Sequence, residues 1–236
     1  QAGASPRGIA FAAGNAEAIF VAAPTKEVLK GTVSRIRDAL ELAGRDRYAA
    51  RIYTLVTLVT DETDEKAQAK YEDYLSYASP EGALVFMSGW MGVDLSQYDL
   101  DEPVGNVESN AIQSAVQNFA ESAKHGEEFT VRDIAVNGAI GGLGPTLVGG
   151  AESIADQLQE WVAYTDVDGF NLAYAITPGT FEDVVEHVIP VLRERGVRLL
   201  YDAPKRGTAN SRINFVHPKD AGGVLVELVE PASAPH

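Results

Sequence analysis

The first residues of the chain combine small side chains with the signal of a helix start. Residues 1–4, QAGA, indicate the end of a buried strand, and Ser5 and Pro6 follow them. A serine side chain caps free N–H groups of a helix, and proline is favoured at the first helical position. Free N–H groups and the helix dipole at such a junction attract anions. The segment therefore predicts either an anion site, such as one for a phosphate, or a helix cap that binds no ligand.

Other residues that could do chemistry lack the spacing that it needs. The glycine-rich stretch contains neither a Walker pattern nor a GxGxxG between a clear strand and a helix, so we predict a loop at Gly138, Gly141, Gly142, Gly144, Gly149 and Gly150. Neither a zinc site nor a Ser-His-Asp triad can be assembled from His125, His187, His217 and His236. We expect His187 to lie on a helix, partly exposed. The residues alone identify no catalytic group and predict no metal site.

The composition limits the classes of partner. The 236 residues are 45% hydrophobic and 22% charged, which is typical of a globular protein, and the net charge is -15. Such a charge repels phosphate backbones and anionic lipid, so nucleic acid and membrane surfaces are not expected partners. The chain has no cysteine, which excludes disulfides and a thiol nucleophile and fits a reducing compartment. No signal segment or membrane-spanning run is found, and we expect a cytoplasmic protein.

Hydrophobic periodicity places helices and strands in alternation before residue 78. A short helix over 7–15 and a strand over 17–23 precede an amphipathic helix that ends at Gly44. The apolar stripe of that helix contains Val28, Leu29, Val33, Ile36, Leu40 and Leu42. A β-branched strand over 51–60 then leads to a helix over 64–77, capped by Asp61 or Thr63. This alternation predicts an α/β fold with a parallel sheet and right-handed crossovers.

Residues 78–145 interrupt the alternation and are interpreted as an insertion. Aromatic and large apolar residues gather over 86–98, which predicts either a lid over a pocket or a loop packed on the rim of the fold. A helical stretch is expected over 107–125. The alternation resumes with a short extended piece that enters a helix near 151, a strand over 168–174 and a helix over 181–195. Three strands are clear before residue 195, whereas a closed α/β barrel needs eight.

Four stretches, taken together and in order, resemble the bacterial-luciferase-like flavin monooxygenases. They are QAGASPRGIAFAAGNAEAIFVAA, SGWMGVDLSQYDLDEPV, VGGAESIADQLQEWV and DGFNLAYAITPGTFEDVVEHVIPVLRERG. The resemblance is strongest to the branch of nitrilotriacetate, dibenzothiophene-sulfone and long-chain alkane monooxygenases. It covers residues 1–195 and corresponds to the C-terminal half of the family's (β/α)8 TIM barrel.

The family resemblance implies a function and a site. Members use reduced FMN, supplied by a separate flavin reductase, to activate O2 and insert one oxygen into a small organic substrate. The family's QAG(A/T)S segment ends the fifth barrel strand and contacts the FMN phosphate, which implies that Ala4 and Ser5 bind FMN here. We therefore expect a partial barrel that is inactive alone, and a homo-oligomer or a partner that supplies the missing strands.

The end of the chain departs from this pattern. From about residue 193 it resembles the C-terminus of methylmalonyl-CoA epimerases, so we place a domain boundary between 195 and 196. RINFVHP and GVLVELVE flank KDAGG as the strands of a β-hairpin would, and alternation places Leu225, Glu227 and Val229 on one face. In the epimerases the glutamate matching Glu227 is a metal ligand, but the other ligands have no match here. Glu227 is alternatively an edge-strand charge that discourages aggregation.

Three functions follow from these observations. The first is an FMN-dependent monooxygenase in a truncated form, which the longer resemblance favours. The second is a module related to methylmalonyl-CoA epimerase, and the third is a non-catalytic chimeric α/β fragment. The sequence does not identify the substrate.

Overall fold

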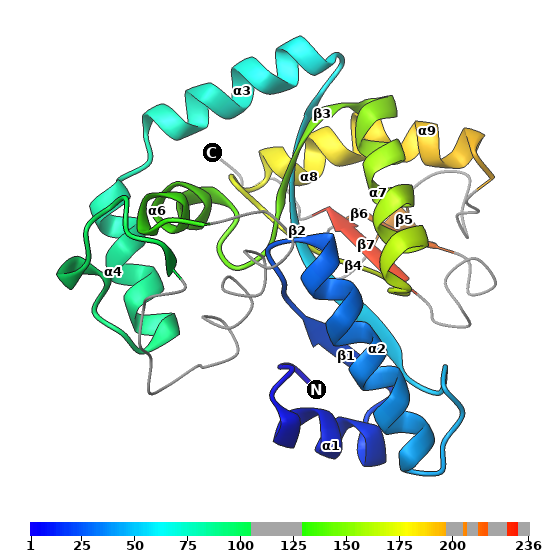
Figure 1. Cartoon of the computed structure of the whole chain (residues 1–236). Coiled ribbons are helices and arrows are strands. Elements are labelled where there is room, and N and C mark those ends of the chain that lie inside the picture. Colours follow the sequence, from blue (N-terminus) through cyan, green and yellow to red (C-terminus); the bar gives the residue numbers. More distant parts are fainter. Residues whose placement is uncertain (105–128, 197–204, 207–211, 217–225, 231–236) are drawn as a thin grey trace.

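The computed structural model describes residues 1–104, 129–196, 205–206, 212–216 and 226–230. Figure 1 shows a parallel sheet with helices around it and a separate small sheet near the C-terminus. The parallel sheet contains β1 (Ala18–Val21), β2 (Arg51–Asp61), β3 (Thr146–Gly150) and β4 (Gly169–Ala173). Its three strand pairings are all parallel, which confirms the α/β class and the parallel sheet predicted from the alternation.

Strand β2 is the centre of this sheet and is longer than each of its neighbours. Its first half pairs with β1, its second half with β3, and its middle with β4. Arg51 and Thr57 donate their backbone N–H groups toward β1 and toward the residue before β3, whereas Ile52 accepts from Asp168 on the opposite side. Strands β1 and β3 therefore follow one another along one edge of β2, and β4 occupies the other edge.

The opening residues add to the β1 edge of the sheet. The backbone N–H of Phe20 donates to Gln1, and the N–H of Gly3 donates to Phe20, which makes a parallel bridge between Ala2 and Phe20. The expected end of a buried strand at residues 1–4 is thus present only as a single bridge at Ala2, and residues 1–3 are exposed. Helix α1 (Pro6–Asn15) follows directly.

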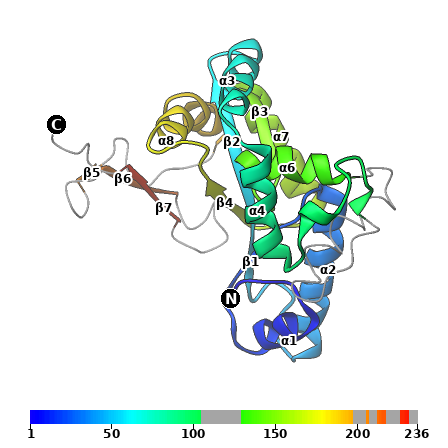
Figure 2. The ribbon, with the colours of Figure 1, turned by 90° about the vertical axis from the view of Figure 1, so that its left-hand side faces the viewer.

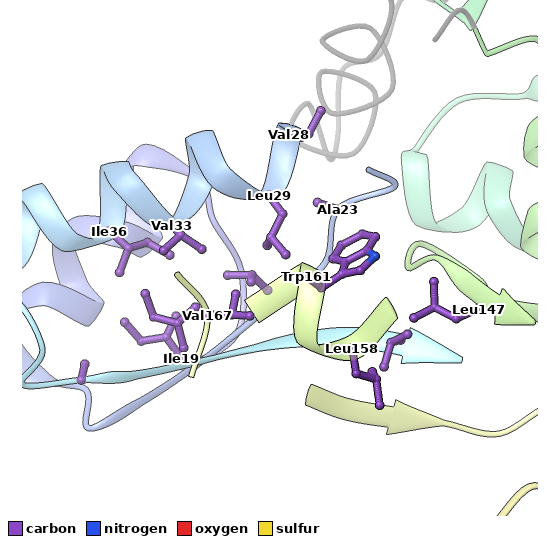
Figure 3. Close-up of a cluster of buried hydrophobic side chains, with 14 of the residues drawn as sticks. Ile19, Ala23, Val28, Leu29, Val33, Ile36, Leu147, Leu158, Trp161 and Val167 are labelled. Atoms are coloured by element: carbon purple, nitrogen blue, oxygen red, sulfur yellow. The ribbon is translucent and has the colours of Figure 1, made fainter. Parts of the chain in front are cut away.

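The main hydrophobic core lies between the sheet and two long helices, α2 (Lys26–Leu42) and α7 (Ala151–Thr165). Figure 3 shows side chains of both helices and of the strands meeting there: Ile19, Ala23, Val28, Leu29, Val33, Ile36, Leu147, Leu158, Trp161 and Val167. The apolar stripe predicted for α2 is confirmed except at Leu42. That side chain is 90% exposed, because it is the last residue of the helix and lies off the buried stripe.

Shorter helices complete the α/β part. Helix α3 (Asp64–Ser76) follows β2 and is capped by Thr63 rather than by Asp61. After β4, the predicted helix over 181–195 is divided into α8 (Gly179–Asp183), a π-helical segment η3 (Val184–Val188) and α9 (Ile189–Glu194). His187 lies in η3 and is half-buried, as predicted.

The two faces of the parallel sheet differ in burial. Even-numbered residues of β2 such as Ile52 and Val56 are buried under the helices, whereas Tyr53 and Leu55 on the other face are only half-buried. Phe20 is 42% exposed on that second face and stacks on Tyr53, with 5.6 Å between ring centroids. Parallel sheets are ordinarily covered on both faces, so this face has the character of an interior surface.

The segment between α3 and β3 forms a helical unit with its own core. It contains α4 (Pro80–Met91), the 3₁₀ turn η1 (Leu95–Gln97) and α6 (Val131–Ile140). Met87, Met91, Leu95, Val104, Val131 and Ile134 form this second cluster. Residues 86–98, predicted to be a lid or a loop, instead complete α4 and form η1, because the apolar side chains at 83, 87 and 91 have helical spacing. The helix expected over 107–125 lies outside the described residues. Figure 1 and Figure 2 show α4 and α6 side by side.

The prediction of a loop for the glycine-rich stretch is wrong at its two ends. Gly138 lies inside α6, where the missing side chain lets Met87 approach, and Gly149 and Gly150 are the last residues of β3. Only the middle of the stretch is a turn.

Near the C-terminus, β5 (Lys205–Arg206), β6 (Arg212–Val216) and β7 (Val226–Glu230) form an antiparallel sheet. Glu227 pairs with Phe215 in β6 through the backbone. The segment between these strands and Leu225 lie outside the described residues, so the predicted hairpin connection and metal role of Glu227 remain predictions.

Candidate functional site

The start of α1 is built as the sequence predicts. Ser5 is the N-cap, and its Oγ accepts the backbone N–H of Gly8 at 3.1 Å. Its carbonyl accepts the N–H of Ile9 at 2.8 Å. Within the part of the chain that the structure describes, the backbone N–H groups of Ser5 and Arg7 have no acceptor. These two donors lie at the positive end of the helix dipole and fit an anionic group.

Two glycines and an alanine shape this junction. Gly3 has a φ of 101°, which turns the chain from the sheet edge into the helix. A Cβ on Gly8 would lie 3.2 Å from the Oγ of Ser5, so glycine allows the cap to close tightly. Ala4 is half-buried against the main core, while Ser5 is exposed. The junction is therefore anchored through Ala4 and presents Ser5 outward.

The same four-residue motif occurs a second time, at the start of α4. Residues 5–8 are SPRG and residues 79–82 are SPEG, and in both the serine Oγ accepts the N–H of the glycine at 3.1 Å. The cap hydrogen bond is the same, but the second helical residue is Arg7 in one motif and Glu81 in the other. A carboxylate neutralises a helix N-terminus, whereas a guanidinium adds to its positive potential. The motif at α1 is the one that can attract an anion.

The first turn of α1 also differs from that of the other long helices. Of the α-helices of ten or more residues in the described ranges, only α1 has no acidic residue in its first turn. In a chain of net charge -15, an acid-free helix start bearing an arginine is a local departure toward positive potential.

The start of α7, which follows the glycine pair at the end of β3, is already bonded to a carboxylate of the protein. Gly150 is the N-cap of α7, and its N–H donates to Asp64 Oδ1 at 2.7 Å. The hydroxyl of Ser153 donates to Asp64 Oδ2 at 2.9 Å. These hydrogen bonds, that of the Gly150 N–H first, lower the pKa of the Asp64 carboxyl. A phosphate at this helix start would meet a carboxylate.

A lysine ties three elements together beyond the end of β2. Lys70 Nζ lies 2.8 Å from Asp61 Oδ2 and 2.9 Å from Asp183 Oδ2, and it donates to the carbonyl of Thr60. The hydrogen bond from Lys70 lowers the pKa of Asp61. Burial opposes the charge on Lys70, but its two carboxylate partners outweigh burial and raise its pKa. Lys70 thereby fixes α3 and α8 against the sheet.

The opposite end of the sheet carries a buried arginine. Arg37 from α2 is 1% exposed and donates to Asp168 Oδ2 at 2.8 Å and to the carbonyl oxygens of Ala50 and Asp166. Arg51 donates to the other oxygen of Asp168 at 2.9 Å. Because this network lies where β2 and β4 begin, we assign it to stability.

Comparison with known proteins assigns the chain to a family. The model of the family described as luciferase-like monooxygenase matches residues 1–196. The chain belongs to this family. The chain is 43% identical over 229 residues to dimethyl-sulfide monooxygenase of Hyphomicrobium sulfonivorans, across 92% of this chain and 46% of that protein. It is 35% identical to dibenzothiophene-sulfone monooxygenase of Rhodococcus erythropolis, across 83% of this chain and 44% of that protein.

Solved structures agree with the family assignment. The crystal structure of DmoA from Hyphomicrobium sulfonivorans superposes with a TM-score of 0.72 at 43% identity, over 88% of this chain and 43% of that one. The chain spans about half the length of the curated relatives it matches. The likeness to methylmalonyl-CoA epimerase from Mycobacterium tuberculosis covers only 19% of this chain and 29% of that one, at 73% identity and a TM-score of 0.18.

The structure also identifies groups that sequence reasoning missed. Lys70 and Asp183 are separated by 113 residues, and Asp64 and Gly150 by 86. No local pattern in a single sequence indicates such pairings. The repeated SPxG motif, by contrast, was visible in the sequence and identifies Arg7 by comparison with Glu81. Across the described residues, no group of three histidine or acidic side chains could hold a metal ion, and no helix is long and apolar enough to cross a membrane.

Proposed function

We propose that this chain carries the FMN-phosphate site of a two-component flavin monooxygenase, with Ala4 and Ser5 at the phosphate. The observation that supports the site is the start of α1, where two backbone N–H groups have no acceptor and the first turn carries Arg7 and no acid. The family is flavin-dependent, and FMN ends in a phosphate that these donors fit.

The residues present have distinct roles in this proposal. The N–H groups of Ser5 and Arg7 and the Ser5 hydroxyl hydrogen-bond the phosphate, while half-buried Ala4 fixes the junction against the core. Reduced FMN, supplied by a separate flavin reductase, provides the electrons that activate O2 for insertion of one oxygen into a small organic substrate. The described residues bind and orient the cofactor; none of them is assigned to the oxygen chemistry.

The substrate class is proposed from the relatives. Two of them are named for dimethyl sulfide and dibenzothiophene sulfone, both organosulfur compounds. We propose small organosulfur compounds as the first class to test. Because one face of the parallel sheet is incompletely buried at Phe20, Tyr53 and Leu55, we also propose that further polypeptide covers it in the active enzyme and that the 236 residues alone do not turn over substrate. Substrate-dependent oxygenated product from this chain with FMN, a flavin reductase and NADH under air would contradict that proposal.

The phosphate site is tested by replacing Ser5 and titrating two flavins. Loss of a charge-assisted hydrogen bond costs about 1.5 to 3 kcal/mol, so Ser5→Ala should weaken the binding of FMN roughly ten- to a hundredfold. Ser5→Asp should weaken FMN binding further, because its carboxylate would repel the phosphate. Riboflavin, which has no phosphate, should bind wild type and Ser5→Ala equally. Fluorescence quenching of each flavin measures these affinities.

The second motif supplies a matched control. Ser79→Ala removes the same serine-to-glycine hydrogen bond at the start of α4 and should leave FMN affinity unchanged. Arg7→Glu converts the first motif into SPEG and should weaken binding of FMN without affecting that of riboflavin. If FMN affinity is the same in wild type and Ser5→Asp, the phosphate lies elsewhere and Ser5 is only a helix cap.

A further inference from the structure

Helix α4 is apolar on more than the face that it buries. Met87 and Met91 belong to the second core, and Ala83 is also buried. On other faces Val85 is 74% exposed, and Phe86 lies against Trp90 with 4.7 Å between ring centroids. A helix that is apolar all round is ordinarily covered on several sides. The exposed faces of α4 are therefore accessible to a further molecule.

A cavity of 520 Å³ lies along one of these faces. Its walls are Glu81, Leu84, Val85, Ser88, Gly92, Val93, Asp94 and Ser96. Gly92 has a φ of 63° and ends α4, so the chain turns back and places residues 93–96 beside the helix. Small-molecule sites in proteins have volumes of roughly 300–1,000 Å³ and mostly apolar walls. This cavity has the size and lining of such a site.

The polar groups of the cavity select by charge. Ser88 Oγ accepts the N–H of Leu95 at 3.0 Å and retains its own hydrogen to donate. Hydrogen bonds from Ser96 and Gln97 lower the pKa of Asp94, the first of two carboxylates in the lining. Glu81 is the second carboxylate, and none of the eight lining residues is basic. The rim therefore attracts cations and repels anions.

We propose that this groove on α4 binds small apolar organic molecules that are neutral or carry one positive charge. The concave shape and apolar walls formed by Leu84, Val85 and Val93 fit an alkyl or aryl group, and the two carboxylates fit a cationic substituent. A second copy of the chain would need an extended face of about 800 Å² per partner rather than a cavity of this size. The site is separate from the start of α1 and does not depend on flavin binding.

Three probes that share a phenylthio group test the proposal by isothermal titration calorimetry. They are methyl phenyl sulfide, 2-(phenylthio)ethylammonium and (phenylthio)acetate, titrated into the flavin-free chain at pH 7 and low salt. The ammonium probe should bind about three- to tenfold tighter than the neutral one, because one charge several ångströms from a carboxylate in partly exposed surroundings gains that much. The carboxylate probe should bind more weakly than the neutral one by a similar factor.

Substitutions locate the binding. Val85→Arg places a long cation at an exposed wall and should weaken binding of the ammonium probe at least about tenfold without disturbing the core. Val162→Arg on α7, where the valine is 40% exposed and outside the cavity, is the matched control and should leave the affinity for all three probes unchanged. Glu81→Gln should reduce the preference for the ammonium probe while leaving the neutral probe unaffected.

Several results would overturn the proposal. They are no binding by any probe, equal binding by all three, or the same loss in Val162→Arg as in Val85→Arg. Size-exclusion chromatography with light scattering provides one more test. A dimer that Val85→Arg dissociates would make the groove an interface between two copies and would also overturn it.

Discussion

Asp64 caps a helix that begins 86 residues later, because its carboxylate accepts the backbone N–H of Gly150 at 2.7 Å. Gly150 has no side chain to cap α7, and Asp64, in the first turn of α3, supplies the missing acceptor. The carboxylate thus ties the first turn of α3 to the start of α7, through the N–H of Gly150 and the hydroxyl of Ser153. This explains why a glycine pair leading into a helix is not a phosphate site here, while the start of α1 keeps its free donors.

The first prediction concerns this cap. Asp64→Asn should lower the thermal unfolding midpoint at pH 7, because the amide cannot accept both hydrogen bonds with a full negative charge. Since the folded pKa of Asp64 lies below its ordinary value of 3.8, its contribution is present above that pH and is lost as pH falls through the folded pKa. Thermal unfolding between about pH 2.5 and 6 should show the wild-type advantage shrinking toward acid. Glu65→Gln, one residue away and without these partners, is the control.

The second prediction compares two carboxylates on one guanidinium. Asp168→Ala should destabilise the protein by about 3 kcal/mol, because it leaves the buried charge of Arg37 without its best partner. Asp166 lies 3.4 Å from the same guanidinium but its side chain is 54% exposed, so Asp166→Asn should cost less than about 1 kcal/mol. Urea denaturation of both variants gives the comparison. Equal losses would show that burial of the ion pair does not decide its contribution.

The third prediction concerns the pH dependence of Lys70. Lys70→Met should destabilise the protein by about 1–2 kcal/mol at pH 7, because Asp61 and Asp183 then face each other without a cation. The folded pKa of Asp61 is lowered chiefly by Lys70, so this contribution is present above the ordinary pKa of 3.8 and disappears as pH falls through the folded value. The variant and wild type should therefore converge in stability toward acid. Adding Asp183→Asn to Lys70→Met should recover part of the loss at pH 7.

Local signals in the sequence predicted most of the elements of the α/β part. The cap at Ser5 before Pro6 and the apolar stripe of α2 each depend on signals within a few residues, and the structure confirms both apart from Leu42. For the start of α3 the sequence left Asp61 and Thr63 open, and the structure selects Thr63. Parallel pairing also followed from the alternation, because crossover helices leave few other arrangements.

The errors came where tertiary packing decides the outcome. Residues 86–98 contain glycines and a tryptophan that suggest irregular structure, yet packing against α6 stabilises a helix there. Gly138 lies in α6 because the two helices pack closely at this point. A Cβ there would lie 2.8 Å from Met87 Cγ, so the contact between α4 and α6 requires a small residue. The candidate site shows the same division: Ser5 was predicted locally, while the Asp64 cap and the Lys70 cluster depend on residues distant in the chain.

The last prediction uses two glycines that the sequence alone does not distinguish. A Cβ on Gly144 would lie 2.8 Å from the carbonyl oxygen of Leu55, and this backbone atom belongs to the central strand and cannot easily move. Gly144→Ala should therefore destabilise the protein by about 1–3 kcal/mol. A Cβ on Gly14 meets nothing within 4 Å, and because Gly14 is exposed in α1, Gly14→Ala should add about 0.5–1 kcal/mol through helix propensity. Urea denaturation should give opposite signs for the two variants. If Gly144→Ala is as stable as wild type, the turn before β3 can shift away from β2 without cost, and its close approach to Leu55 is not what requires a glycine.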